Sequence, residues 1–168
     1  MALLMQWIGG LSSRLLLVVF VISAAQFPLY YLAYSNTLAG ARAESEARFT
    51  QLQQEAAALQ LDVETFIQRH EVNSDETFRA SGRIHRTTVQ RYRRYTAMES
   101  MLREAVIWQR PWVLARNFDP ALHAATRFEP GVPLTLEGGA YALAGFLLAW
   151  VLTGLAGAIF MPKVKPRI

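Results

Sequence analysis

Residues 140–160 read AYALAGFLLAWVLTGLAGAIF, a run of 21 residues without a charged side chain. At about 1.5 Å per residue, a helix of this length is roughly 31 Å long and matches the hydrocarbon core of a bilayer, which is about 30 Å thick. Thr135 is placed to cap this helix, and Glu137 would lie in its first turn. The run therefore predicts a membrane-spanning helix, and it assigns the chain to the membrane proteins.

Small residues recur every fourth position along one side of this helix: Gly145, Ala149, Thr153 and Gly157. Small side chains at this spacing allow another helix to approach closely in lipid. We expect these four residues to form a helix-packing face.

A second uncharged run covers residues 15–34 and reads LLLVVFVISAAQFPLYYLAY. Its length also suits a membrane span, and Pro28 is expected to kink it. Arg14 followed by an apolar run and the small residues 23–25 also resembles a cleavable signal peptide. Because the apolar run continues to Tyr34, we favour an uncleaved anchor.

Gln26 is the one amide side chain inside this second run. Polar groups in lipid usually face another helix or a cavity, so Gln26 is a candidate contact with a partner or a pore. The alternative is a local role, in which Gln26 serves the backbone groups that Pro28 leaves unpaired.

The chain has a net charge of +4, and the residues that account for it flank the apolar runs. Residues 35–138 contain 13 arginines and 13 acidic residues, so the excess comes from Arg14, Lys163, Lys165 and Arg167. Basic residues flanking spans favour the cytoplasmic side. We therefore expect both termini in the cytoplasm, residues 35–138 in the periplasm of a bacterial inner membrane, and no nucleic-acid partner.

The polar middle of the chain has helical periodicity. Its apolar residues follow coiled-coil-type spacing in two arms. The first arm runs to about Arg69 and carries Phe49, Leu52, Ala56, Leu59, Val63 and Phe66. The second arm covers about residues 75–108 and carries Tyr95, Met98, Leu102 and Ala105. Residues 72–76 form the expected turn, with Ser74 as N-cap. Gly82 would weaken the second arm by about 1 kcal/mol relative to Ala. The pattern predicts an all-α protein with two transmembrane helices flanking an antiparallel helical hairpin.

This organisation gives four segments. Residues 1–34 hold the first span, residues 35–109 the extracytoplasmic hairpin, residues 110–138 an interfacial segment and connector, and residues 139–168 the second span with its basic tail. Within the third segment, Pro111 is expected to end the returning helix. Asp119 and Pro120 are expected to begin a short helix over 121–128, as cap and first residue.

Five arginines interleaved with aromatic residues form a candidate patch for an anionic partner: Arg83, Arg86, Arg91, Arg93 and Arg94. The hairpin would bring them beside Glu55, Asp62 and Glu64, so ordinary ion pairing is the simpler interpretation. Anionic lipid headgroups, a cell-wall polymer or an acidic protein are the alternatives.

The sequence contains no pattern typical of an enzyme or a cofactor site. There is no cysteine, no phosphate-binding loop, no nucleophile elbow and no paired-carboxylate motif. His70, His85 and His123 lack metal-ligand spacing, and His70 and His85 could meet only through a tertiary contact. We therefore expect no catalytic residue, no cofactor and no metal.

Several short segments occur in a characteristic order. QFP at 26–28 is followed by the helical region, then by RP at 110–111, DPAL at 119–122, VPLT at 132–135 and YALAG at 141–145. Together they resemble a small proteobacterial inner-membrane family catalogued as domain of unknown function 2937. The resemblance implies two spans and a bacterial membrane location, and it supplies no activity and no functional residues.

Three functions fit these features. The first is a non-enzymatic accessory or scaffold protein that binds copies of itself or a membrane partner through its last span and hairpin. The second is a subunit of an oligomeric channel or transporter, with Gln26 and Thr153 facing the pore. A periplasmic sensor is disfavoured, because only about eight residues follow the last span.

Overall fold

The computed structural model describes residues 2–131 and 135–160, and within these ranges the chain is helical and contains no β-strand. The all-α prediction is confirmed. Two of the described helices are long and apolar enough to cross a membrane, and they contain the two predicted spans. The elements are α1 (Ala2–Ala58), α2 (Val63–Glu71), α3 (Glu76–Glu104), η1 (Ile107–Gln109), α4 (Arg110–Arg116), α5 (Pro120–Ala125) and α6 (Leu136–Phe160).

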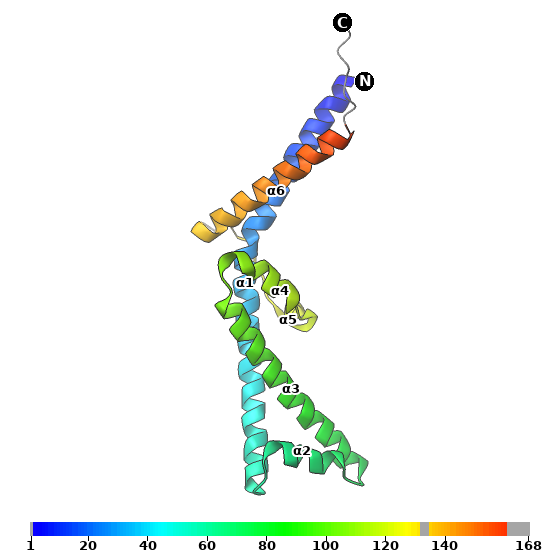
Figure 1. Ribbon diagram of the computed structural model, residues 1–168, viewed down its shortest axis with the longest axis vertical. Helices are drawn as coiled ribbons and strands as arrows, with labels where there is room; N and C mark the ends of the chain where they lie inside the picture. The colour runs from blue at the N-terminus through cyan, green and yellow to red at the C-terminus, as the bar shows by residue number, and fades with distance from the viewer. Residues whose placement is uncertain (1, 132–134, 161–168) are drawn as a thin grey trace. The chain divides into compact units, whose positions relative to one another are not determined.

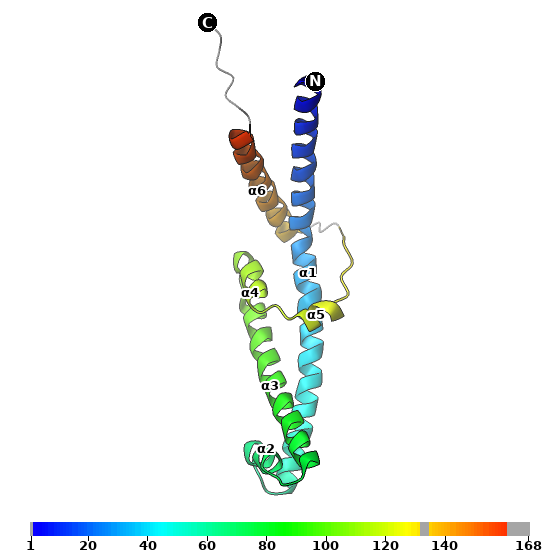
Figure 2. The ribbon, with the colours of Figure 1, turned by 90° about the vertical axis from the view of Figure 1, so that its right-hand side faces the viewer.

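The chain forms two compact units, which we call the span unit (Met1–Leu32 with Phe128–Ile168) and the helical unit (Ala33–Arg127). In the span unit, α6 runs beside the first part of α1, so that the end of α6 and the beginning of α1 lie at the same end of the pair (Figures 1 and 2). α1 continues through Pro28 without ending there. The predicted cap of α6 is confirmed, because the Gly138 N–H donates to Thr135 Oγ1 over 3.0 Å.

Close approach of the two span helices occurs at Gly145, which is buried. A Cβ at this position would lie 2.6 Å from the Cβ of Ala24 and 2.9 Å from the carbonyl oxygen of Phe20. One turn further along α6, Ala149 is only 1% exposed. The small-residue face of α6 is therefore in contact with α1 of the same chain at these two positions.

In the helical unit, α1 ends eleven residues earlier than the expected position near Arg69. The Leu61 N–H donates to Ala56 O, the Gln60 N–H donates to Ala57 O, and Gln60 has a φ of 56°. This is the hydrogen-bond pattern of a Schellman C-cap, with glutamine where glycine is usual. The predicted continuous first arm is therefore wrong.

A separate helix, α2, follows this corner and lies crosswise between the end of α1 and the start of α3 (Figure 1). The Asp62 carboxylate caps α2 by accepting a hydrogen bond from the Thr65 N–H over 3.0 Å. The next helix is capped by Asp75, which accepts from the Thr77 N–H, and so Ser74 was wrongly predicted as the N-cap.

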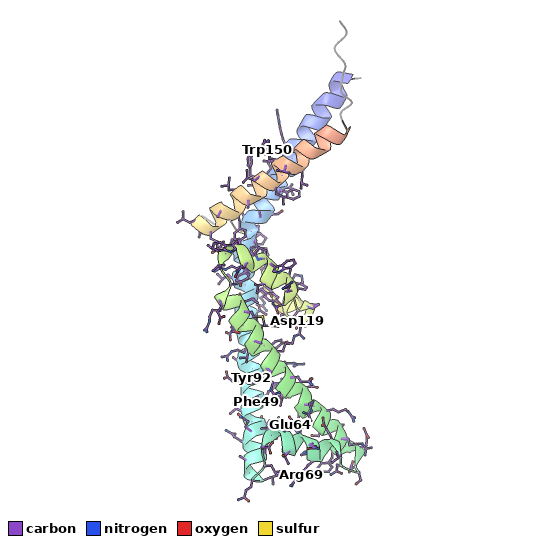
Figure 3. The ribbon with its side chains drawn as sticks, in the orientation of Figure 1. Phe49, Glu64, Arg69, Tyr92, Asp119 and Trp150 are labelled. Carbon is purple, nitrogen blue, oxygen red and sulfur yellow. The ribbon has the colours of Figure 1, made fainter. Side chains whose placement is uncertain are left out.

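The return helix α3 packs antiparallel to the part of α1 that lies in the helical unit. Phe49 and Tyr92 stack with their ring centroids 4.7 Å apart, and Figure 3 shows them on facing parts of the two helices. Arg42 Nε lies 2.8 Å from a carboxylate oxygen of Glu99. The main apolar cluster combines residues from all three helices: Leu52, Ala56, Phe66, Ile67 and Val89.

The chain after α3 turns sooner than predicted. α3 ends at Glu104, and Pro111 lies in the first turn of the new helix α4 instead of ending the return helix. Asp119 and Pro120 begin α5 as predicted, although this helix ends at Ala125 and not at residue 128. The buried Tyr34 holds this segment, because its hydroxyl accepts a hydrogen bond from the Asp119 N–H over 3.0 Å.

Candidate functional site

The predicted small-residue face and Gln26, the predicted intramembrane amide, both make contacts inside the span unit. Thr153 Oγ1 donates to the carbonyl oxygen of Ala149 over 2.8 Å, which is a bond within α6. Gln26 Nε2 donates to Gly131 O over 2.6 Å, and the Gly131 N–H donates to Gln26 Oε1 over 3.1 Å. Gln26 therefore pairs with both backbone groups of one connector residue, Gly131, instead of serving the backbone near Pro28. The burial of Gly157 and the whole of the basic tail lie outside what the structure describes.

The five arginines of the predicted anionic-partner patch separate into paired and unpaired residues. Arg86 binds Glu64 and Glu71, and Figure 3 marks Glu64 on α2. Arg83 binds Glu76, and Arg94 lies 3.0 Å from the buried carboxylate of Asp119. Arg91 and Arg93 are exposed and make no ion pair with any residue that the structure describes.

Arg86 connects α2 with α3 electrostatically. Its Nη2 lies 2.8 Å from Glu71, and this hydrogen bond lowers the pKa of the Glu71 carboxyl below its usual value while the carboxylates raise the pKa of Arg86. Of the three acids expected to pair with the patch, Glu64 does so. Arg86 thus has a structural role, and it is not free for a partner.

Two histidines that could meet only through a tertiary contact do so where α2 crosses α3. The rings of His70 and His85 lie 5.5 Å apart, centroid to centroid, and Phe66 lies against both. His70 Nδ1 lies 2.9 Å from Phe66 O, and His85 Nε2 lies 3.1 Å from Ser81 Oγ. The two residues are 15 positions apart, and this spacing does not predict a contact. Within the described ranges, no group of three or more His, Cys, Asp or Glu side chains is arranged to hold a metal ion.

Protonation of His85 is disfavoured in the folded chain. Burial lowers its pKa below the ordinary value of 6.5, the nearby charge of His70 lowers it further, and Glu55 acts in the opposite direction. Since the unfolded chain then binds a proton more readily, folding stability is complete above pH 6.5 and falls as the pH decreases toward the lowered pKa.

We expect thermal unfolding of the full chain to show this loss below pH 6.5, and His85→Gln to make the profile flatter in that range. His123→Gln is the control, since His123 lies on α5 and away from this pair. Equal slopes for the wild-type chain and His85→Gln would contradict the assignment.

An exposed aromatic surface covers η1 and α4. Trp108 is 78% exposed and Trp112 is 62% exposed. The guanidinium carbon of Arg116 lies 4.6 Å from the centroid of the Trp112 ring, a cation–π contact. We call these three residues the Trp–Arg surface. A hollow of about 400 Å³ adjoins it, lined in part by Met101 and Val113. Tryptophan and arginine are enriched in protein interfaces, and tryptophan is also enriched at membrane surfaces.

The chain matches the family described as Protein of unknown function (DUF2937) over residues 8–165. The chain belongs to this family. No curated protein and no solved structure matches it. Membership confirms the resemblance to domain of unknown function 2937 seen in the sequence. The description of this family names no activity.

Proposed function

We propose that this DUF2937 chain is a non-enzymatic scaffold protein of the bacterial inner membrane, which binds copies of itself or a membrane partner. Both termini would lie in the cytoplasm and residues 35–138 in the periplasm. The partner would contact the last span and the helical unit, at or beside the membrane surface.

The apolar exterior of the span unit supports the membrane location. Leu15 and Ile22 on α1 and Trp150 and Leu148 on α6 are each more than half exposed. In water, such a surface would be unfavourable by roughly 25 cal/mol for each Å² of apolar area. A bilayer covers it on all sides, while Gly145 and Ala149 hold the two helices together.

The proposed orientation is tested with a single cysteine at Ser74, which is exposed between α2 and α3. The natural chain has no cysteine, so the label can attach only there. A maleimide that does not cross membranes should label Ser74→Cys in spheroplasts with intact inner membranes. Labelling only after lysis would place the helical unit in the cytoplasm.

The observation that carries the scaffold proposal is the exposed Trp–Arg surface. Large aromatic side chains that are well exposed in an isolated chain are typical of sites where a partner removes water. The small apolar cluster where α1, α2 and α3 meet points the same way, because it buries only five side chains among the residues that the structure describes. The channel alternative lacks comparable support, since Gln26 and Thr153 both form hydrogen bonds within the span unit.

The scaffold proposal is tested by the mass of the complex extracted gently from native membranes. We expect a multiple of 18.9 kDa, or a mass that includes a second protein. Replacing Trp108 and Trp112 by Ser should reduce the mass to that of one chain. Val72→Ser, which also removes a well-exposed apolar side chain, should leave the complex intact. A wild-type mass of one chain would contradict the proposal.

A further inference from the structure

A hollow of about 440 Å³ lies between α1 and α3 in the helical unit. Its arginines have N–H donors that the ion pairs described above leave unused. Arg48 of α1 and Arg83 and Arg91 of α3 line it. Hydroxyl side chains complete the polar lining: Ser45, Thr87 and Thr88. Among the lining residues that the structure describes, there is no carboxylate.

The arginines retain most of their hydrogen-bonding capacity. Arg48 binds Glu44 through one terminal nitrogen at 2.6 Å, and Arg83 binds Glu76 through one terminal nitrogen at 2.9 Å. Arg91 has no carboxylate partner in the described ranges. Because a guanidinium group carries five N–H donors, each of the three can still donate to a ligand in the hollow.

We propose that this hollow binds a phosphate-bearing anion through Arg48, Arg83 and Arg91. A carboxylate has two oxygens and is satisfied by a single arginine fork, whereas a phosphate group offers enough oxygens for donors arriving from several directions. The hollow is larger than one phosphate group, and Ile84, which is 65% exposed, provides an apolar contact beside the arginines. The anion is therefore an organic phosphate, either a phospholipid headgroup or a free phosphate ester.

This site differs from the patch predicted from the sequence. The structure adds Arg48, which lies 35 positions before Arg83, and it leaves out Arg86, Arg93 and Arg94, which do not line the hollow. The proposal does not depend on the scaffold function, because it concerns other residues of the helical unit.

The test is calorimetric titration of the full chain with inorganic phosphate, in nanodiscs of zwitterionic lipid. We expect saturable binding that weakens about tenfold in Arg91→Gln, since a hydrogen bond to a charged group accounts for roughly that factor. Arg48→Gln changes the opposite helix and should weaken binding similarly. Arg93→Gln is the matched control, because it removes the same charge two positions away and outside the hollow, and it should change the affinity less than twofold.

A second titration in nanodiscs containing phosphatidylglycerol distinguishes the two sources of phosphate. In one outcome, the apparent affinity for inorganic phosphate falls in these nanodiscs for the wild-type chain and stays unchanged for Arg91→Gln. That result would support the proposed site and identify a lipid headgroup as its ligand. An unchanged affinity would support the hollow and identify a free phosphate ester. Absence of saturable binding in the first titration, or equal weakening by Arg91→Gln and Arg93→Gln in chains with unchanged circular dichroism, would overturn the proposal.

Discussion

Replacing Gly82 by Ala is expected to destabilise the helical unit, although alanine is the better helix former. A Cβ at position 82 would lie 2.8 Å from the backbone nitrogen of Glu71 and 3.0 Å from the Cβ of His70. Since the nearest atom belongs to the backbone of α2, the contact cannot be relieved by a side-chain rotation. Overpacking of this kind costs about 1–3 kcal/mol, which exceeds the gain of up to about 1 kcal/mol from helix propensity.

The measurement is hydrogen exchange of the α2 amides in the full chain. Gly82→Ala should lower the free energy of opening of α2, and the loss should extend to the contact between His70 and His85. Gly40→Ala is the matched control, because a Cβ at that position of α1 meets nothing within 4 Å. This control should be neutral or stabilising, by up to about 1 kcal/mol. If Gly82→Ala also stabilised the chain, the close approach of α2 to α3 would be wrong.

Replacing Gly145 by Leu is expected to separate the two span helices. The first added atom would lie 2.6 Å from the Cβ of Ala24 and 2.9 Å from Phe20 O, and the rest of the leucine side chain would need further space. α6 would have to move away from α1, losing the dispersion contacts that their close packing provides. We expect a loss of stability of about 3 kcal/mol, at the upper end for overpacking.

The separation can be followed by cross-linking. The rings of Phe27 and Tyr141 lie 5.1 Å apart, so a chain carrying Phe27→Cys and Tyr141→Cys should be joined by a short bismaleimide. Adding Gly145→Leu should abolish this cross-link. Adding Gly154→Leu should preserve it, because a Cβ at Gly154 meets nothing within 4 Å. Loss of the cross-link in both variants would show that any leucine in α6 disturbs the pair.

The sequence predicted the features that depend on local chemistry. The uncharged run of α6 has the length of a membrane span, and Asp119 followed by Pro120 begins a helix because aspartate caps and proline fits the first position. Asp62 caps α2 in the same way, by accepting a hydrogen bond from the Thr65 N–H. This start was missed because the periodic apolar pattern continues from α1 into α2 and predicts one unbroken helix. The end of α1 could not be predicted, because a glutamine occupies the left-handed position that usually requires glycine.

Features that depend on distant contacts were not predictable from one sequence. Gly82 appeared to be a weak point of a helix, and it is the residue that admits the backbone of α2. His70 and His85 have no metal-ligand spacing and meet only because α2 crosses α3. Likewise, the hollow combines Arg48 with Arg83 and Arg91, and no local pattern joins residues so far apart.

The pairing of Gln26 with Gly131 has a consequence for biosynthesis. The two residues are 105 positions apart, and the span unit consists of two segments between which residues 33–127 intervene. At about 5–20 residues per second, the ribosome needs roughly 5–20 s to add those residues. During that interval the nascent chain holds the first span without its partner helix, with Gln26 and the surface facing Gly145 unoccupied. Until α6 has been synthesised, the first part of α1 therefore exposes the surface that it later buries against Gly145.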